Sequence, residues 1–167
     1  MDKKLYLIAE LDNDTQNIMK NYYKIILKHN IIGSQTKDIP YHITLCSYPL
    51  ENERNIINLM DKINGKINEI EIQFSGFGLF RLNVLYFNPA MSKKLLDLYD
   101  FFKDNNDNKN HDFTAHTTLL IDESENVLKV LSEIAKDFKA FSGRIVNLSL
   151  YEFSPKKFIY SIELISI

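Results

Sequence analysis

Two short runs decide the fold of this chain: Tyr41-His42-Ile43-Thr44-Leu45 and Ala115-His116-Thr117-Thr118-Leu119. Each run contains the pattern His-x-Thr-Leu within an apolar, strand-like stretch. Side chains alternate between the two faces of a β-strand, so His42 shares a face with Thr44, and His116 shares one with Thr118. Residues two apart lie roughly 6–7 Å apart along a strand, so one imidazole and one hydroxyl can contact the same phosphate-sized group. Two such strands facing each other across a cleft would present two histidines and two threonines to one ligand.

The composition excludes several classes of protein. The 167 residues are 45% hydrophobic and include nine Tyr and eleven Phe, which favours a folded core over disorder. A net charge of -2 argues against binding along a long nucleic-acid duplex, which needs a concentrated basic face, but allows one nucleotide or one RNA end. The single Cys46 cannot form an intrachain disulfide, which fits a reducing compartment. We find no signal peptide or membrane-spanning pattern and expect a soluble, cytoplasmic protein.

Strand and helix patterns alternate along the chain. We expect strands at residues 5–10, 41–47, 70–80, 84–87, 113–121, 143–153 and 158–165, with helices between most of them. Gly76 and Gly78 interrupt the third strand, which indicates a bulge or a close backbone contact. The dipeptide Asn88-Pro89 is typical of a helix start, because proline is favoured at the first helical position.

The pattern of elements repeats. The two motif histidines are 74 residues apart, and the same offset carries the strand at 70–80 onto residues 144–154. We therefore expect a duplicated β-α-β-α-β unit, with pseudo-repeats at about 1–80 and 81–155 and a C-terminal strand at 157–165 that completes one lobe. The predicted fold class is α+β. It is a single bilobal domain over residues 1–167, with two antiparallel sheets, helices outside and a central groove where the motif strands meet.

Paired His-x-Thr strands, one in each half of a duplicated α+β chain, resemble the two-histidine (2H) phosphoesterase superfamily. This superfamily includes RNA 2′,3′-cyclic phosphodiesterases and 2′-5′ RNA ligases, and the resemblance covers essentially the whole chain. Members often have proline immediately before the motif histidine, whereas this chain has Tyr41 and Ala115. Several RNA-processing members carry a basic residue shortly after the second motif, whereas Leu120-Ile121-Asp122-Glu123 follow it here.

The resemblance implies a metal-independent cyclic phosphodiesterase that acts on the 2′,3′-cyclic phosphate of RNA ends or nucleotides, with 2′-5′ RNA ligation as the reverse reaction and no cofactor. Imidazole suits acid–base catalysis because its pKa lies near neutral pH, so His42 and His116 are the expected acid–base pair. Hydroxyl donors stabilise charge on phosphate oxygens, which is the expected role of Thr44 and Thr118. By the same resemblance, His116 activates water and His42 protonates the leaving oxygen.

Five further residues are candidate substrate contacts: Tyr41, Phe113, Tyr48, Lys37 and His111. The aromatic ones adjoin the motifs and can stack a base, although core packing is the commoner role of such residues. Lys37 and His111 precede the motif strands, where the rim of a groove is expected. Strict alternation places Cys46 on the face of His42 and Thr44, and we interpret it as a packing residue.

Three alternatives stay open. The groove can bind a nucleotide phosphate without turnover, or it can serve small cyclic nucleotide or cyclic oligonucleotide signals in place of RNA ends. A metal hydrolase would use His42, His111, Asp112 and His116. However, His111 and His116 are five residues apart and face opposite sides of a strand, so we expect no metal. We expect a monomer whose partner is a nucleotide or RNA-terminal phosphate, and neither a membrane nor a long duplex.

Overall fold

A computed structural model of the chain describes residues 3–104, 106–107, 112–153 and 155–166. Its elements are β1 (Lys4–Leu11), α1 (Asn13–Leu27), β2 (His42–Pro49), the 3-10 turn η1 (Leu50–Asn52), α2 (Glu53–Ile63), β3 (Ile70–Phe80), β4 (Val84–Pro89), α3 (Lys93–Phe102), β5 (Thr117–Ile121), α4 (Ser124–Asp137), β6 (Phe141–Phe153) and β7 (Lys157–Glu163). The fold class is α+β, as predicted. The strands form one antiparallel sheet in the order β2-β1-β6-β3-β4-β5, with β7 also paired to β6.

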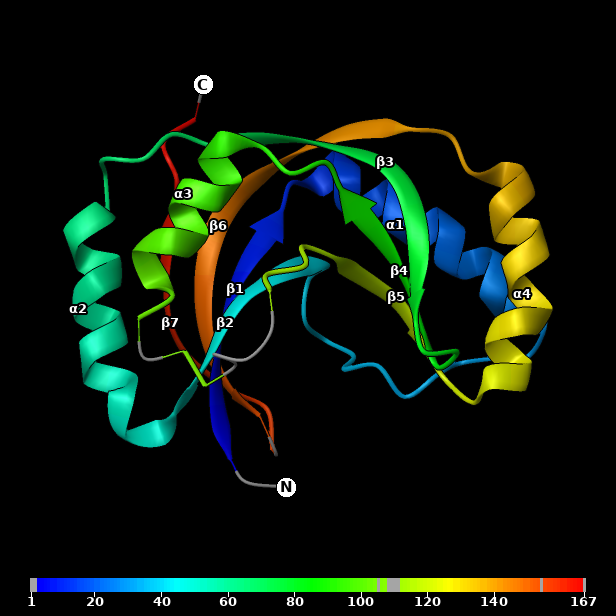
Figure 1. Cartoon of the computed structure of the whole chain (residues 1–167), viewed down its shortest axis with the longest axis horizontal. Helices are drawn as coiled ribbons and strands as arrows, with labels where there is room; N and C mark the ends of the chain where they lie inside the picture. The colour runs from blue at the N-terminus through cyan, green and yellow to red at the C-terminus, as the bar shows by residue number, and fades with distance from the viewer. Residues whose placement is uncertain (1–2, 105, 108–111, 154, 167) are drawn as a thin grey trace.

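The long strand β6 joins the two halves of the sheet. One edge of β6 pairs with β1. Its other edge pairs first with β3, over residues 141–145, and then with β7. Figure 1 shows the sheet arching between α2 and α3 on one side of the molecule and α1 and α4 on the other. The helices therefore lie outside, and the two lobes are parts of one continuous sheet.

Each half of the chain has the element order β-α-β-α-β, from β1 to β3 and from β4 to β6. The register between β3 and β6 agrees with the 74-residue offset between the motifs. Ile70 pairs with Ile145, and Glu71 pairs with Arg144. A shift of 74 residues carries position 70 onto 144 and position 71 onto 145, so it maps each of these pairs onto the other. We infer that the halves are repeats related by an approximate two-fold axis through this strand pair. The last strand of each half pairs with the first strand of the other half, since β3 pairs with β4 and β6 pairs with β1.

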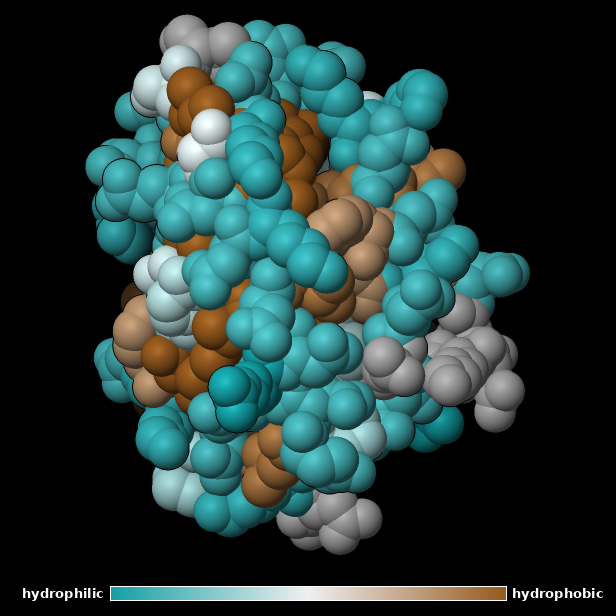
Figure 2. Space-filling model, turned by 90° about the vertical axis from the view of Figure 1, so that its left-hand side faces the viewer, coloured by the Kyte–Doolittle hydropathy of each residue, from teal (hydrophilic) through white to brown (hydrophobic). Residues whose placement is uncertain are grey.

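Helix α2 shows why the helices pack as they do. Ile56, Met60 and Ile63 recur at helical spacing and are buried, and Ile57 and Leu59 beside them are partly buried against the core. Figure 2 views the molecule from the side of α2, and most of this face is hydrophilic with strips of apolar surface between polar side chains. Of the helices in the described ranges, none is both long enough and apolar enough to cross a membrane.

Most element boundaries differ from the sequence prediction by one to four residues, and two of these differences bear on the motifs and on α3. The dipeptide Asn88-Pro89 stays in β4, and α3 begins at Lys93 because Ser92 caps it by accepting a hydrogen bond from the Leu95 backbone N–H at 3.2 Å. The second motif strand, β5, begins at Thr117, so His116 lies just before the strand.

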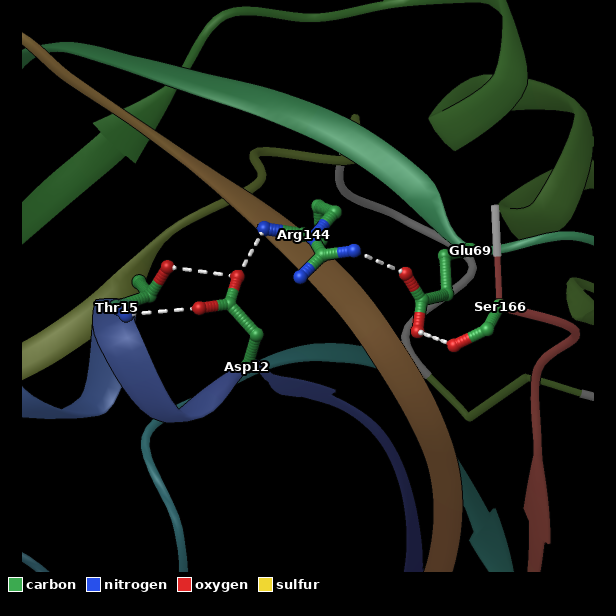
Figure 3. Close-up of polar contacts among 5 residues, drawn as sticks. All are labelled: Asp12, Thr15, Glu69, Arg144 and Ser166. Atoms are coloured by element: carbon green, nitrogen blue, oxygen red, sulfur yellow. Dashed lines mark hydrogen bonds and ion pairs between the residues drawn. The ribbon is translucent and has the colours of Figure 1, made fainter.

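Asp12 connects the start of α1 to β6 (Figure 3). Its carboxylate accepts hydrogen bonds from the Thr15 backbone N–H at 2.9 Å, from the Thr15 hydroxyl at 3.0 Å and from the Arg144 backbone N–H. The Arg144 guanidinium pairs with Glu69 at 2.7 Å, and Glu69 accepts from the Ser166 hydroxyl at 3.0 Å. Burial raises the pKa of Asp12, but the hydrogen bonds from Thr15 and Arg144 outweigh it and hold that pKa below its usual value.

Replacing Asp12 should weaken the fold in a pH-dependent way. We expect Asp12→Ala to lower the free energy of unfolding by about 1–2 kcal/mol at neutral pH, because the cap of α1 is lost. Because the pKa of Asp12 is lower in the folded chain, its contribution is present above about pH 4 and is lost as pH falls through the folded pKa. Urea denaturation across pH measures both effects. Asp14→Ala, at an exposed position in the same turn, is the control, and an equal loss in both variants would contradict the assignment.

Candidate active site

The two motif strands meet although they lie at opposite ends of the strand order. β2 and β5 are the first and last strands of that order, yet they contact each other in space because the sheet curves (Figure 1). His42 begins β2, and His116 immediately precedes β5. A charge on His116 is close enough to disfavour a charge on His42. The structure therefore brings the two histidines to one side of the sheet.

A β-bulge follows the threonine of each motif. The register between β1 and β2 skips Leu45, directly after Thr44. The register between β4 and β5 skips Leu119, directly after Thr118. These leucines occupy the same position in the two motifs. A bulge adds one residue to its strand, so the residues that follow it turn to the opposite face from the one that strict alternation predicts.

The bulge in β2 explains why two sequence-based assignments are corrected. Cys46 pairs with Leu7 and Tyr48 pairs with Leu5, on the core side of the sheet. Tyr48 is fully buried, and its hydroxyl donates to the Phe102 carbonyl oxygen at 2.6 Å, so it is a core residue and not a substrate contact. Burial raises the pKa of the Cys46 thiol to about 11, which leaves little nucleophilic thiolate at neutral pH.

The same hydrogen bond fixes both motif imidazoles. Nδ1 of His42 lies 2.7 Å from the Pro40 carbonyl oxygen, and Nδ1 of His116 lies 2.8 Å from the Thr114 carbonyl oxygen. A carbonyl oxygen only accepts hydrogen bonds, so Nδ1 carries the proton in each ring. The neutral ring then has its lone pair on Nε2, where it can take a proton, and the protonated ring can donate one from the same atom. Each imidazole is thereby arranged for acid–base chemistry.

Burial is the main influence on both histidines. It lowers the pKa of His42, while the hydrogen bond to Pro40 and the charge of Glu10 raise that pKa and the charge of His116 lowers it further. Burial also lowers the pKa of His116, against the opposing hydrogen bond to Thr114. The net direction is downward for both rings, so both are largely neutral at neutral pH.

Two aromatic rings pack around His116. Phe80 meets the imidazole edge-on with centroids 4.7 Å apart, Tyr86 does so at 5.5 Å, and the two aromatic rings stack at 4.3 Å. Gly78 leaves room for this arrangement, since a Cβ there would lie 2.6 Å from the Tyr86 hydroxyl oxygen. The close contact expected at the glycines of β3 is therefore present. Sequence reasoning missed Phe80 and Tyr86, because only the pairing of β4 with β3 and β5 brings them to the motif.

A cavity of about 620 Å³ opens beside the motifs. His116 of one motif and Thr44 of the other line it, together with the aromatic residues Tyr6, Phe80, Tyr99 and Phe113. Phe113 stacks on Tyr99 with centroids 4.1 Å apart and planes 5° from parallel. The cavity therefore combines an acid–base group and a hydroxyl with flat aromatic walls.

The remaining predicted residues lie in varied places. Thr118 is half-buried and pairs with Tyr86 across β4. Tyr41 is half-buried against the core, its backbone hydrogen-bonds with the Gln16 side chain at 2.8 Å in both directions, and burial raises its pKa to about 12. Lys37 is exposed in the segment before β2. His111 lies outside the described residues. Within the described ranges, no three His, Cys, Asp or Glu side chains are grouped as metal ligands would be.

Comparison with known proteins identifies the fold. No family model matches the chain, and no curated protein matches it in sequence. E. coli LigT complexed with 3′-AMP superposes with a TM-score of 0.68 and 17% identity over 99% of both chains. The chain has the LigT fold. TT0787 of Thermus thermophilus has a TM-score of 0.70 with 11% identity over 96% of this chain and 97% of that one. Kluyveromyces marxianus Usb1 has a TM-score of 0.51 with 14% identity over 97% of each chain.

These likenesses confirm, at the level of the fold, the resemblance to 2H phosphoesterases that the sequence indicated. They extend over nearly the full length of the chain and of the compared proteins, so both lobes share the LigT arrangement. In this LigT-like chain, the two His-x-Thr motifs occupy the strands that approach each other between the lobes.

The two motif histidines should show matching behaviour in solution. We expect both rings to be protonated on Nδ1 when neutral, and both to titrate below the ordinary value of about 6.5. Because each pKa is lower in the folded than in the unfolded chain, stability should fall as pH decreases below about 6.5. Two-dimensional ¹H–¹⁵N spectra of the imidazoles across pH measure this, with His42→Gln and His116→Gln assigning the signals. A proton on Nε2 in either neutral ring would contradict the geometry.

The core position of Tyr48 can be tested independently. Tyr48→Phe removes the hydroxyl that satisfies the Phe102 carbonyl, so the free energy of unfolding should fall by about 1 kcal/mol. Because Tyr48 faces the core, the affinity of the protein for a nucleotide should be unchanged. Urea denaturation and nucleotide titration of the same preparation measure both quantities. Weaker nucleotide binding by Tyr48→Phe would contradict the core assignment and support Tyr48 as a substrate contact.

Proposed function

We propose that this LigT-like protein is a two-histidine phosphodiesterase that opens the 2′,3′-cyclic phosphate of a nucleotide or RNA end. The observation that carries the proposal is the matched pair of motifs. In both, the imidazole Nδ1–H donates to the carbonyl oxygen two residues earlier, and a threonine two residues later is followed by a bulge. E. coli LigT, which has the same fold, has been crystallised with 3′-AMP, ATP, NADP+ and phosphate, which supports a nucleotide substrate here.

The proposed chemistry follows from these groups. Nε2 of the basic histidine takes a proton from water as the water oxygen bonds to phosphorus. The bond from phosphorus to one ribose oxygen breaks, and the other histidine gives its Nε2 proton to that oxygen. The hydroxyls of Thr44 and Thr118 donate hydrogen bonds to the non-bridging oxygens, where negative charge develops. A 2′-5′ linkage would form if the 5′-hydroxyl of a second strand took the place of water: its oxygen bonds to phosphorus as one histidine takes its proton, the bond from phosphorus to the ribose 3′ oxygen breaks, and the other histidine protonates that oxygen. These steps need no metal or cofactor.

The lining of the cavity favours a small substrate. Among the described residues that line it, Asp112 is charged and none is a lysine or arginine. A long RNA would bring further phosphates, whose binding depends on cationic side chains. The aromatic walls suit a base instead, because any nucleobase can stack on an aromatic ring. We therefore infer a mononucleotide or a short end as substrate. A cyclic oligonucleotide signal is the runner-up within the same chemistry.

Loss of either motif histidine should nearly abolish turnover. We expect His42→Ala and His116→Ala each to lower kcat on a 2′,3′-cyclic nucleotide by about 10²–10⁴-fold. The double variant should be little worse than the poorer single variant, because the two groups act as a unit. The measurement is a panel of 2′,3′-cyclic, 3′,5′-cyclic and 2′-5′-linked substrates, with the position of the product phosphate determined by NMR. His29→Ala is the control, since His29 pairs with Glu133 at 3.0 Å between α1 and α4.

The alternatives give different results in the same assay. A wild type that cleaves no substrate, and behaves like the double variant, rejects the enzyme. Tight nucleotide binding without turnover supports the silent binding module. Loss of activity on adding a chelator supports the metal hydrolase.

A further inference from the structure

The two motifs match in hydrogen bonding and bulge position but differ in the residue beside each histidine. In the β1–β2 register, Glu10 lies directly opposite His42. The β4–β5 pairing ends with Phe87 opposite Thr117, and the rings of Phe80 and Tyr86 lie against His116. A carboxylate therefore neighbours one histidine, and aromatic rings neighbour the other.

Glu10 faces the same side of the sheet as the motifs. Its strand carries Tyr6, which lines the cavity, and Ile8, which pairs with Thr44, at alternate positions on that face. Side chains directly opposite each other in an antiparallel pair have Cβ atoms about 4.5–5.5 Å apart. The carboxylate of Glu10 is thus within the electrostatic range of the His42 ring.

An amide on β6 holds the Glu10 carboxylate in place. Asn147 is the partner of Glu10 in the β1–β6 register, and its Nδ2 donates to Glu10 Oε2 at 3.2 Å and to the Ser149 hydroxyl at 3.0 Å. Asn147 Oδ1 is buried and has no hydrogen-bond partner among the described residues. The opposite amide orientation would set two oxygens against each other. The amide of Asn147 is therefore oriented so that its Nδ2 donates to the Glu10 carboxylate, and its Oδ1 is left without a hydrogen bond.

We propose that Glu10 is a positioning residue for the acid–base pair: its carboxylate, held opposite His42, favours the protonated form of His42 over that of His116 and so suits His42 to the role of general acid. This rests on the proposed function and gives a physical cause to the polarity that the family resemblance implied. In each turnover His42 gives its Nε2 proton to the leaving ribose oxygen while His116 gains one from water. Solvent then returns a proton to His42 and removes one from His116.

The other charged or titratable groups near His42 fit this division. His116, across the groove from His42, disfavours a charge on His42 when it is itself protonated, so the doubly protonated pair is disfavoured. Burial, and to a smaller degree the charge of Glu10, raise the pKa of the Tyr151 hydroxyl on β6, so this group stays neutral at neutral pH. Glu10 is thus the negative charge that favours protonation of His42, whereas His116 lies against the stacked rings of Phe80 and Tyr86.

The test is the pH dependence of kcat/KM on a 2′,3′-cyclic nucleotide. The rising limb reports deprotonation of the base and the falling limb reports deprotonation of the acid. Glu10→Gln keeps the shape and an acceptor for Asn147 but removes the charge, so the falling limb should move down by about 0.5–1 pH unit while the rising limb stays. Glu10→Asp, which restores a carboxylate, should move the falling limb back.

Each contrary result overturns the proposal. A shift of the rising limb in Glu10→Gln would assign the base to His42. A lower kcat with both limbs in place would make Glu10 merely structural. If no variant and no wild type turns over substrate, the proposed function fails, and NMR titration of the His42 ring still tests the role of Glu10. In that case, a His42 titration midpoint that is the same in the wild type and Glu10→Gln would overturn it.

Discussion

The pairing of β3 with β6 is the constraint on which the site depends. It joins the two halves into one sheet, and the curvature of that sheet brings β2 and β5 together from its two ends. Neither motif contributes a complete site, since each supplies one imidazole and one hydroxyl. The relative position of the two motifs is thus determined by backbone hydrogen bonds distant from the histidines, and the helices stabilise it by covering the outside of both lobes.

The two motifs have the same backbone geometry, but the side chains beside their histidines differ. The matched carbonyl acceptors and matched bulges orient both rings and both threonines in the same way. Acid–base catalysis, however, needs two groups in different protonation states. The neighbours supply that difference, with a carboxylate opposite one imidazole and aromatic rings around the other. A repeated backbone can therefore give precise positioning while a few unrepeated side chains give direction to the reaction.

Much of this was predictable from the sequence, and the reasons are local. A two-residue spacing places each histidine and threonine on one face. The offset between the motifs predicts the repeat, and Gly78 predicts a close contact. The interpretation of Cys46 as a packing residue agrees with its burial, but the face expected for Cys46 and the substrate contact considered for Tyr48 are wrong. Both have one cause, because a bulge reverses alternation and nothing in the sequence of a single strand marks its position. Glu10, Phe80 and Tyr86 were missed because their roles depend on registers between strands that are distant in sequence.

The exchange of last strands between the halves bears on how such a chain arises. A solitary half would leave the outer edge of its first strand without a partner, and an open edge of this kind invites association. Two identical half-length copies that swapped these strands would satisfy both edges, as in a domain-swapped homodimer. A precursor of half the length would therefore have partners for all its strand edges only as a dimer. Fusion of two such copies into one chain would let the surroundings of each histidine diverge, and the placement of Glu10 opposite His42 alone is the kind of difference that this would allow.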